Sequence, residues 1–474
     1  MSDSRADMRR KIDNWFDLHL DEMLEDFRKL IAVKSVRGLP QEGAPYGEGS
    51  RAVLALAKTM LEERGYPVCE FEDIMITADM GPSPPQLGIL AHLDIVDPGE
   101  GWDTDPYVMT IKDNRIYARG TVDNKGPALA GMYAMYCVND IYPKLKSGFR
   151  LILGSGEETG CDDIAQYLSK NEPPPSVFTP DADYPVVNTE KGRAAVFFNA
   201  AWEKDIVLPR VVSITGGRTM NVVPNRAEAV IEGMTPDEAE PYCSEYSAKT
   251  GAPISPVVDG DKLIVKAEGT AAHAAMLHLG LNAQTALLEM LAAMPFAESK
   301  GQDKIRALSR LFPHGDIYGR ALGIEMSDAE SGKLTVNFGV LDFTETGFTG
   351  NIDSRTSVCA DKTDLLGMIR DALEREGVRM THSNVSKSHH TPGDSVFVQT
   401  LLRIYEEYTG EPGRCLAIGG QTYVHDIPGG VAFGCEMEGT DNRIHGANEF
   451  IGIPQLIISA KMFTQAIVDT CADI

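Results

Sequence analysis

Acidic and histidine side chains follow several short apolar segments of this 474-residue sequence. His92 and Asp94 lie two residues apart at the end of the apolar run 86–96, and side chains at positions i and i+2 share one face of a strand. Other acidic residues come after an apolar run or in a glycine-flanked loop that opens a helical segment: Asp123, Glu157, Glu158 and Asp181. Because open α/β sheets build their sites beyond the carboxyl ends of parallel strands, we expect these side chains to converge there.

Carboxylates crowded at one sheet edge repel one another unless a cation lies among them. One histidine, four or five carboxylates and a later histidine form the ligand set of a two-metal hydrolytic site. Borderline ions such as Zn²⁺ and Mn²⁺ accept this mixture of nitrogen and oxygen donors. Any one of these acidic residues alone is more often a solvated turn residue, so the prediction rests on their combination.

The elements that must position these residues form three consecutive patterns. Residues 10–190 alternate buried-strand and helical segments, which predicts a largely parallel α/β sheet. Residues 193–385 read as short antiparallel strands with separate helices, an α+β pattern. After His390 the first pattern returns. We therefore predict a discontinuous α/β catalytic domain in residues 1–190 and 386–474, with an inserted α+β lid domain in residues 191–385.

Composition excludes several classes of protein. Asp and Glu number 69 against 44 Lys and Arg, a formal net charge of -25, which disfavours nucleic acid and anionic membrane surfaces as partners. The N-terminal segment 1–22 is charged throughout and carries no signal-peptide pattern, and no run is long enough to span a bilayer. Eight cysteines without a C-x-x-C pair indicate reduced thiols. We expect a cytoplasmic monomer that acts on a small molecule.

Joint motifs resemble the co-catalytic zinc metallopeptidase family of aminoacylases, carboxypeptidase G and cytosolic dipeptidases, and are most similar to PepV/Sapep-like dipeptidases. The motifs are H-L-D-I-V-x-P-G-x-G-W (92–102), Y-A-R-G-T-V-D-N-K-G-P (117–127), G-S-G-E-E-T-G (154–160), T-P-D-A-D-Y-P-V-V-N-T-E-K-G (179–192), G-T-A-A-H-A (269–274), I-G-G-Q-T-Y (418–423), G-V-A-F-G (430–434) and I-H-G-A-N-E-F (444–450). The resemblance extends from about residue 10 to residue 470 and is weakest in the inserted domain.

The resemblance implies a role for each matching residue. The metal ligands would be His92 and Asp181 for one ion, Glu158 and His445 for the other, and Asp123 as the bridge between them. Asp94 would orient His92, and Glu157 would be the general base. His273 of the inserted domain would donate to the oxyanion. The family also has a cis peptide bond after the bridging residue, here Asp123–Asn124.

Substrate contacts are implied for Asn221, in T-M-N-V-V-P, and for Arg355, in N-I-D-S-R-T, whose planar fork suits a C-terminal carboxylate. Gln421 stands where close relatives have the third glycine of G-G-G-T-Y, and His425 lies where they have Gly-Arg. These departures leave the metal ligands unchanged and predict an altered substrate preference. Asn124 likewise replaces the second acid of an Asp-Asp pair.

The sequence therefore predicts a metallopeptidase with two divalent ions, Zn²⁺ first and Mn²⁺ or Co²⁺ as alternatives, that hydrolyses dipeptides with a free C-terminal carboxylate. An N-acyl-amino-acid amidohydrolase with the same metal core is the alternative enzyme. A non-catalytic interaction protein is a further alternative, which the intact set of ligand and base positions disfavours.

Overall fold

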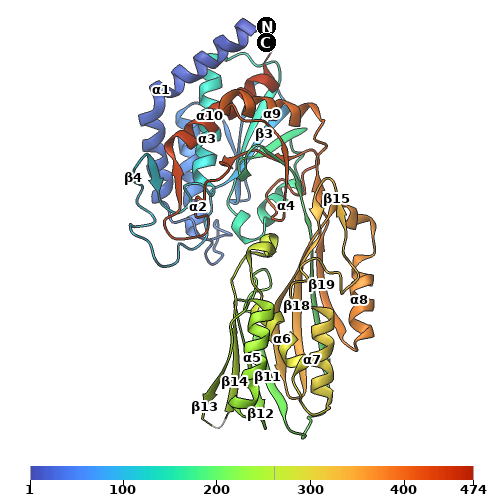
Figure 1. Ribbon diagram of the computed structural model, residues 1–474. Helices are drawn as coiled ribbons and strands as arrows, with labels where there is room; N and C mark the ends of the chain where they lie inside the picture. Colours follow the sequence, from blue (N-terminus) through green and yellow to red (C-terminus); the bar gives the residue numbers. More distant parts are fainter. Residues whose placement is uncertain (1, 261, 473–474) are drawn as a thin grey trace. The chain divides into compact units, whose positions relative to one another are not determined.

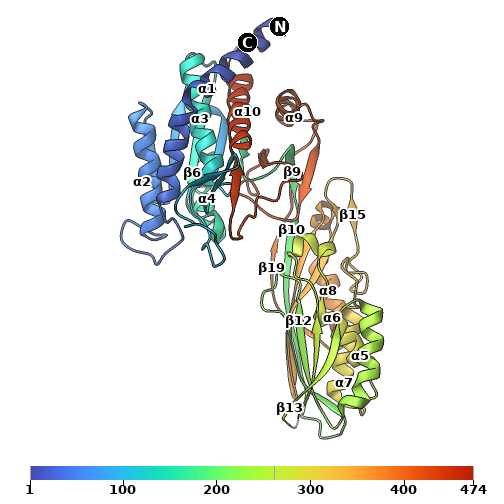
Figure 2. The same cartoon turned by 60° about the vertical axis from the view of Figure 1, so that its left-hand side comes forward.

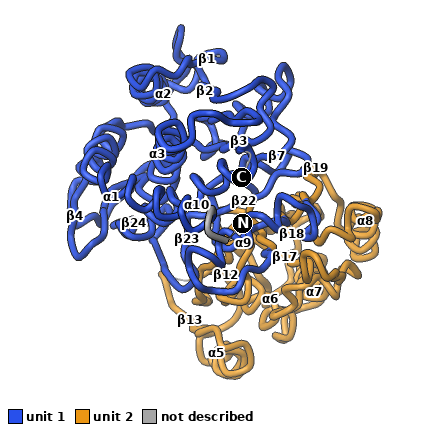
Figure 3. Tube along the Cα trace, turned by 90° about the horizontal axis from the view of Figure 1, so that it is seen from above, with its two compact units in different colours: residues 1–189, 390–416, 421–474 blue, residues 190–389, 417–420 orange. Residues whose placement is uncertain are grey.

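The computed structural model describes residues 2–260 and 262–472. The described residues form two compact units, which lie within 1–189, 390–416 and 421–474 and within 190–389 and 417–420 (Figure 3). The sequence led us to expect divisions at 190/191 and 385/386. The structure groups residues 417–420, which we had placed in the second part of the catalytic domain, with the inserted unit. In the described part of the chain, no helix is long and apolar enough to cross a membrane.

The first unit is built on a mixed sheet in the order β1-β2-β6-β3-β7-β22-β9-β20, with β21 beside β9. Its strands are β1 (Val68–Phe71), β2 (Met75–Met80), β3 (Pro85–His92), β6 (Gly148–Gly154), β7 (Ser176–Thr179), β9 (Val186–Glu190), β20 (His389–His390), β21 (Cys415–Ile418) and β22 (Val431–Ala432). β3 pairs in parallel with both β6 and β7, and β22 pairs in parallel with β7. The predicted parallel centre of the sheet is confirmed.

Helices cover both faces of this sheet (Figures 1 and 2). They are α1 (Ser2–Ala32), α2 (Glu48–Glu63), α3 (Lys125–Ile141), α4 (Asp162–Leu168), α9 (Val396–Thr409) and α10 (Ile453–Cys471). Leu87, Ile89 and Ala91 of β3 pack in the core shared with α1, α3 and α10, whereas Leu90 packs with residues of α4 in a core on the other face. Burial on both faces explains why the sequence of β3 is continuously apolar.

Two small additions lie beside the main sheet of this unit. β4 (Thr110–Lys112), β5 (Arg115–Tyr117) and β24 (Phe450–Gly452) form a three-stranded antiparallel sheet. A hairpin turn at Asp113–Asn114 connects β4 and β5, and both turn residues have a positive φ. β8 (Ala182–Asp183) pairs with β23 (Cys435–Glu436).

The second unit is an antiparallel sheet with helices packed on one face. Its strand order is β13-β14-β12-β11-β17-β18-β10-β19. The strands are β10 (Gly192–Ala201), β11 (Arg210–Gly216), β12 (Arg226–Glu232), β13 (Ile254–Asp259), β14 (Lys262–Glu268), β17 (Thr335–Thr344), β18 (Gly347–Thr356) and β19 (Arg379–Ser386), with β15 (Ser327–Asp328) and β16 (Gly332–Lys333) as a separate pair. The helices are α5 (Pro236–Thr250), α6 (Ala283–Ala293), α7 (Lys300–Leu311) and α8 (Leu365–Arg375). Alternate residues such as Val196 and Phe198 of β10 enter the core beneath these helices.

Leucine substitutions at a buried and an exposed position should differ sharply in their effect on the first unit. Leu151 of β6 is fully buried, so Leu151→Ala should lower the free energy of unfolding by about 2–5 kcal/mol because it leaves a cavity. Leu18 of α1 is 82% exposed, and Leu18→Ala should change the free energy of unfolding by less than about 0.5 kcal/mol. Urea unfolding followed by the fluorescence of Trp15 and Trp102 measures both; equal effects would contradict the assigned burial.

Candidate metal centre

His92 is the last residue of β3 and is fully buried. Because β6 and β7 flank β3 in parallel, the loops that follow them open at the same sheet edge as His92. Glu157 and Glu158 lie in a short 3-10 helix (Glu157–Thr159) after β6, and Asp181 lies directly after β7. The predicted convergence of strand-end residues is therefore present.

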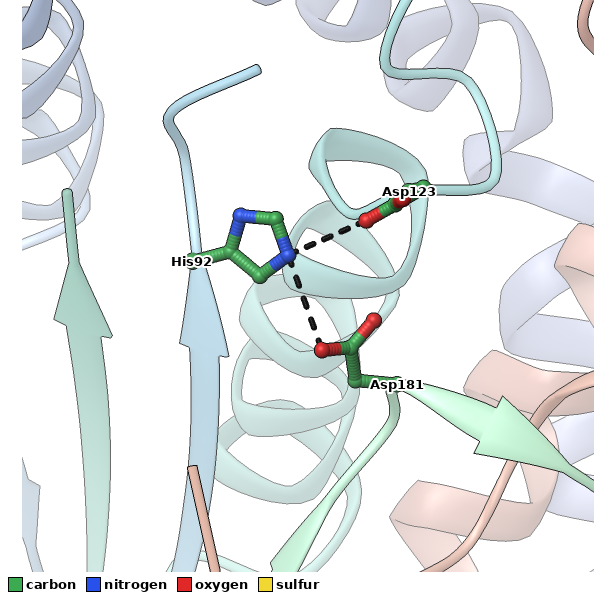
Figure 4. Close-up of side chains that lie close together, drawn as sticks. All are labelled: His92, Asp123 and Asp181. Atoms are coloured by element: carbon green, nitrogen blue, oxygen red, sulfur yellow. Dashed lines mark ion pairs between the residues drawn. The ribbon is translucent and has the colours of Figure 1, made fainter. Parts of the chain in front are cut away.

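Figure 4 shows one nitrogen of His92 turned towards two carboxylates that come from different loops. His92 Nε2 lies 3.1 Å from Asp123 Oδ1 and 3.6 Å from Asp181 Oδ2. Glu157 Oε2 is farther away, at 4.0 Å from the same nitrogen. One oxygen of Asp123, one of Asp181 and the imidazole nitrogen thus lie close enough to share a metal ion.

Asp123 faces a second histidine with its other oxygen. Asp123 Oδ2 lies 2.9 Å from His445 Nε2, and the same nitrogen lies 3.0 Å from Glu158 Oε2. The structure therefore contains two possible metal-ligand triads, His92–Asp123–Asp181 and Asp123–Glu158–His445, which have Asp123 in common. One carboxylate with one oxygen in each triad is the arrangement expected of a bridging ligand.

The remaining side chains at this edge support the two triads. Asp94 lies on the other side of the His92 ring, with its Oδ1 3.3 Å from His92 Nδ1, and its Oδ2 accepts a hydrogen bond from the Glu158 amide. Asn124 donates from Nδ2 to Asp181 Oδ1 at 2.9 Å, so an amide here holds one of the candidate ligands. The Asp123–Asn124 peptide bond is cis, as the resemblance implies.

Crowding of like charges shifts the proton affinities of the cluster. Burial and the charge of Asp181 raise the pKa of Glu157 well above its ordinary value, and burial with the charge of Asp123 raises the pKa of Glu158 to about 6. Hydrogen bonds to Asp123 and Glu158 raise the pKa of His445 to about 10. For Asp123 burial favours a higher pKa, but the imidazoles of His445 and His92 beside it outweigh burial and lower the pKa. The cluster is thus an environment that favours positive charge.

Two orphaned atoms test whether a metal ion fits this cluster. His92 Nε2 and Glu158 Oε1 are buried and have no hydrogen-bond partner, although buried polar atoms nearly always have one. His92 Nε2 belongs to one triad, and the Glu158 carboxylate belongs to the other. Unpaired imidazole nitrogen and carboxylate oxygen are donors that a borderline divalent cation accepts, so the residues present fit a metal centre.

The loop of Asp123 is held by a buried carboxylate that the sequence reasoning did not single out. Glu449 is fully buried, and its two oxygens accept hydrogen bonds from the backbone amides of residues 120, 122 and 123 at 2.9–3.3 Å. Arg119 donates to Glu449 Oε2 at 2.6 Å and to the carbonyl of Gly446, next to His445. Arg119 and Glu449 therefore join the loop of Asp123 to the loop of His445. Its one sequence signal was the N-E-F that follows I-H-G-A.

A second buried carboxylate holds the loop of Glu157 in the same way. Asp163 Oδ2 accepts from the amides of Ser155 and Gly156 at 2.8 and 2.9 Å and from the Tyr423 hydroxyl at 2.5 Å. Tyr423 ends the I-G-G-Q-T-Y motif and is buried. The segment that carries Gln421 is therefore connected to the loop that carries the expected base.

Asn221 and His273 lie together in the second unit. The amide of residue 274 donates to the carbonyl of Asn221, and Asn221 Nδ2 lies 3.5 Å from His273 Nε2. The amide of Ala275 donates to His273 Nδ1 at 3.2 Å. Because Nδ1 accepts this bond, the neutral ring carries its proton on Nε2.

Arg355 and Gln421 are bonded within their own units. Arg355 lies on β18, is 6% exposed, and donates from Nε to Asp353 and from a terminal nitrogen to the carbonyl of Gly419. Gln421 Nε2 lies 3.1 Å from His425 Nε2. The two residues that distinguish this loop from close relatives thus contact each other.

Comparison with known proteins places this site in a family. The sequence model of the peptidase family M20/M25/M40 matches residues 88–469, which is most of the chain. The chain belongs to this family. A Beta-Ala-Xaa dipeptidase from Lactobacillus delbrueckii subsp. lactis is 32% identical over 463 residues, which cover 96% of this chain and 97% of that protein. The predicted family and enzyme class are confirmed: the chain is a metallopeptidase.

Solved structures share the fold of this chain over nearly all of its length. Aminoacylhistidine dipeptidase from Vibrio alginolyticus superposes with a TM-score of 0.59 at 14% identity, covering 95% of this chain and 97% of that one. Human carnosine dipeptidase 1 gives a TM-score of 0.56 at 14% identity and covers 98% of both chains. The predicted fold class is confirmed.

Removing the negative charge of Glu449 should destabilise the metallopeptidase. Glu449→Gln leaves Arg119 buried without its counter-charge, so the free energy of unfolding should fall by about 3–5 kcal/mol. The matched control is Glu438→Gln, because the Glu438–Arg414 pair is exposed, with 64% and 48% of the side chains accessible; it should cost less than about 1 kcal/mol. Urea unfolding measures the stability of both variants. A Glu449 variant as stable as the control would contradict the role of Glu449 in holding the loop of Asp123.

Proposed function

We propose that this M20 metallopeptidase is a dipeptidase that cleaves short peptides with a free C-terminal carboxylate and holds two divalent cations. The observation that carries the proposal is the shared carboxylate: Asp123 directs one oxygen into each of two ligand triads. Similarity over nearly the full chain to a relative named Beta-Ala-Xaa dipeptidase favours dipeptides over N-acyl amino acids.

In this proposal His92 and Asp181 would hold one cation, Glu158 and His445 would hold the other, and Asp123 would contribute to both. When bound, the cations would polarise the scissile carbonyl and lower the pKa of water. The mixed imidazole and carboxylate donors suit Zn²⁺, with Mn²⁺ or Co²⁺ as alternatives. Asp94 would keep the His92 ring oriented, because its backbone carbonyl lies 3.1 Å from Nδ1 and its carboxylate lies 3.3 Å from the same nitrogen; the second nitrogen of a ligating histidine usually has such a partner.

Glu157 is the proposed general base. It belongs to neither triad, yet its Oε2 lies 4.0 Å from His92 Nε2, so its carboxylate borders the centre without being committed to an ion. In this position it can take a proton from water and pass it to the leaving amine. Asp163 and its backbone contacts keep the loop that presents Glu157 in place.

Three of the proposed substrate contacts, His273, Asn221 and Arg355, belong to the second unit. His273 would donate its Nε2 proton to the oxyanion, and the bond from the Ala275 amide to Nδ1 supports this because it fixes the tautomer. Asn221, which lies beside it, would hold the substrate backbone. Arg355 would bind the C-terminal carboxylate, and Gln421 with His425 would set the preference for the C-terminal residue.

Replacing each of the adjacent glutamates by glutamine should separate their roles. Glu157→Gln should keep its metal content and lose at least about 10²-fold in kcat, the usual scale for loss of a general base. Glu158→Gln should instead lose one of the two ions because it removes a ligand oxygen. Elemental analysis of purified protein and steady-state kinetics measure both effects. Equal metal loss in the two variants would mean that the roles are reversed or shared.

A substrate screen tests the proposed function itself. Metal-free protein is reloaded separately with Zn²⁺, Mn²⁺ or Co²⁺ and assayed on dipeptides, tripeptides and N-acetyl amino acids. We expect hydrolysis of dipeptides, and preferential hydrolysis of N-acetyl amino acids would overturn the proposal. In the same screen Gln421→Gly should change the ranking of C-terminal residues through KM more than kcat. An unchanged ranking would remove Gln421 from the substrate site.

A further inference from the structure

A pocket of about 260 Å³ opens in the first unit beside the loop that carries His445. One side of the pocket is the segment Asp103–Thr104, another is Arg443 and Asn448, and the rest is the small sheet of β4, β5 and β24. No residue of either ligand triad lines it. Its size is below the range of about 300–1,000 Å³ that is usual for drug-sized ligands, so it suits a small ligand.

The small sheet turns one distinct face to the pocket. Lys112 pairs with Arg115 across the hairpin, and Tyr117 pairs with Phe450 of β24, so all four side chains lie on one face of the sheet. Residues 111, 116 and 451, which alternate with them, are isoleucines on the opposite face, and the last two are fully buried. The alternation places the cationic side chains on the pocket face and Ile116 and Ile451 in the core.

Three cationic side chains surround the pocket on a chain whose net charge is -25. In the described part of the chain, Lys112, Arg115 and Arg443 form no ion pair with a carboxylate; the side chain of Arg115 lies over the Phe450 ring, 4.4 Å from its centroid. The one carboxylate in the described lining is Asp103, whose Oδ2 already accepts a hydrogen bond from Asn448 Nδ2 at 3.1 Å. The positive charges therefore exceed the negative charge at this place.

Thr104 completes the lining of the pocket beside Asp103. Its Oγ1 is buried and has no hydrogen-bond partner. The pocket itself is therefore dominated by the three cationic side chains, and an oxyanion would meet these positive charges.

We propose that this pocket binds a small polyanion that carries phosphate or several carboxylates. Arginine and lysine donors placed around a cavity of this size bind such groups through charge-assisted hydrogen bonds. The ligand would contact Arg443, two residues before His445, and the β4–β5 hairpin at once. Occupancy would thereby connect the His445 loop to a sheet that is anchored in the core. The site does not depend on which peptide the enzyme cleaves.

Isothermal titration of the metal-loaded protein tests the site with two probes, inorganic phosphate and citrate, in separate arms. The parent should bind at least one probe, and Lys112→Gln/Arg115→Gln and Arg443→Gln should each weaken that binding by at least about tenfold, as expected when charge-assisted bonds are lost. Lys144→Gln is the matched control, an exposed lysine of the same unit that does not line the pocket; it should bind as the parent does.

The metal ions can also bind these probes, and the variants separate the two sites because none of them alters a ligand triad. Equal affinity and stoichiometry in the parent and the pocket variants would assign all binding to the metals and overturn the proposal. Absence of binding by both probes in the parent would overturn it too. Of the two probes, the one that binds the pocket of the parent more tightly shows whether phosphate or a polycarboxylate is the ligand chemistry. The single variants Lys112→Gln and Arg115→Gln, with melting temperatures equal to that of the parent, keep the comparison valid if the double variant is unstable.

Discussion

Mutual repulsion of carboxylates at one sheet edge is the constraint on which this structure depends. Asp123, Glu157, Glu158 and Asp181 converge on two imidazoles in a largely buried volume, where Coulomb interactions are stronger than in water. Such a cluster persists only if its loops are fixed from behind and positive charge lies at its centre. The parallel strands fix where the loops begin, and the buried acids behind them fix how the loops run.

Asp163 and Glu449, the two carboxylates behind the loops, fix the loops without placing a competing cation in the centre. Asp163 and Glu449 each collect backbone N–H groups of the loop that they hold. Backbone amides satisfy a buried carboxylate but carry only partial charge, so they do not neutralise the ligands nearby. Arg119 is the exception, and it is directed at Glu449 and at the Gly446 carbonyl. The centre therefore keeps its negative potential for a metal ion.

Much of this centre could be predicted from the sequence because each side chain lies next to a strand or helix that can be recognised from nearby residues. His92 ends a continuous apolar run, and each loop acid follows a short apolar strand or opens a helix. Glu449 could not be assigned in this way, because its partners lie about 330 residues earlier and are backbone amides, which leave no mark on residue type. The family resemblance supplied the roles that spacing alone left open.

The second unit was less predictable for a different reason. β18 carries Gly350, Asn351, Asp353 and Ser354, residues that are depleted in strands, and it is a strand because β17 and β10 pair with it on both sides. Arg355 consequently lies on a strand. The sequence also gave us no prediction for α7, although Ile305 and Leu308 of this helix are buried in the core.

The order of β22 in the main sheet has a consequence for synthesis of the chain. β22, residues 431–432, lies between β7 and β9, which are made about 250 residues earlier. A nascent chain that has emerged through β9 lacks this strand, and it also lacks the carboxylate of Glu449 that orders the loop of Asp123. Since the N-terminal part of a chain leaves the ribosome first, the hydrolytic centre cannot assemble until β22 and Glu449 have also been made. A peptidase arranged in this way has no competent form while its own unfolded segments are still exposed.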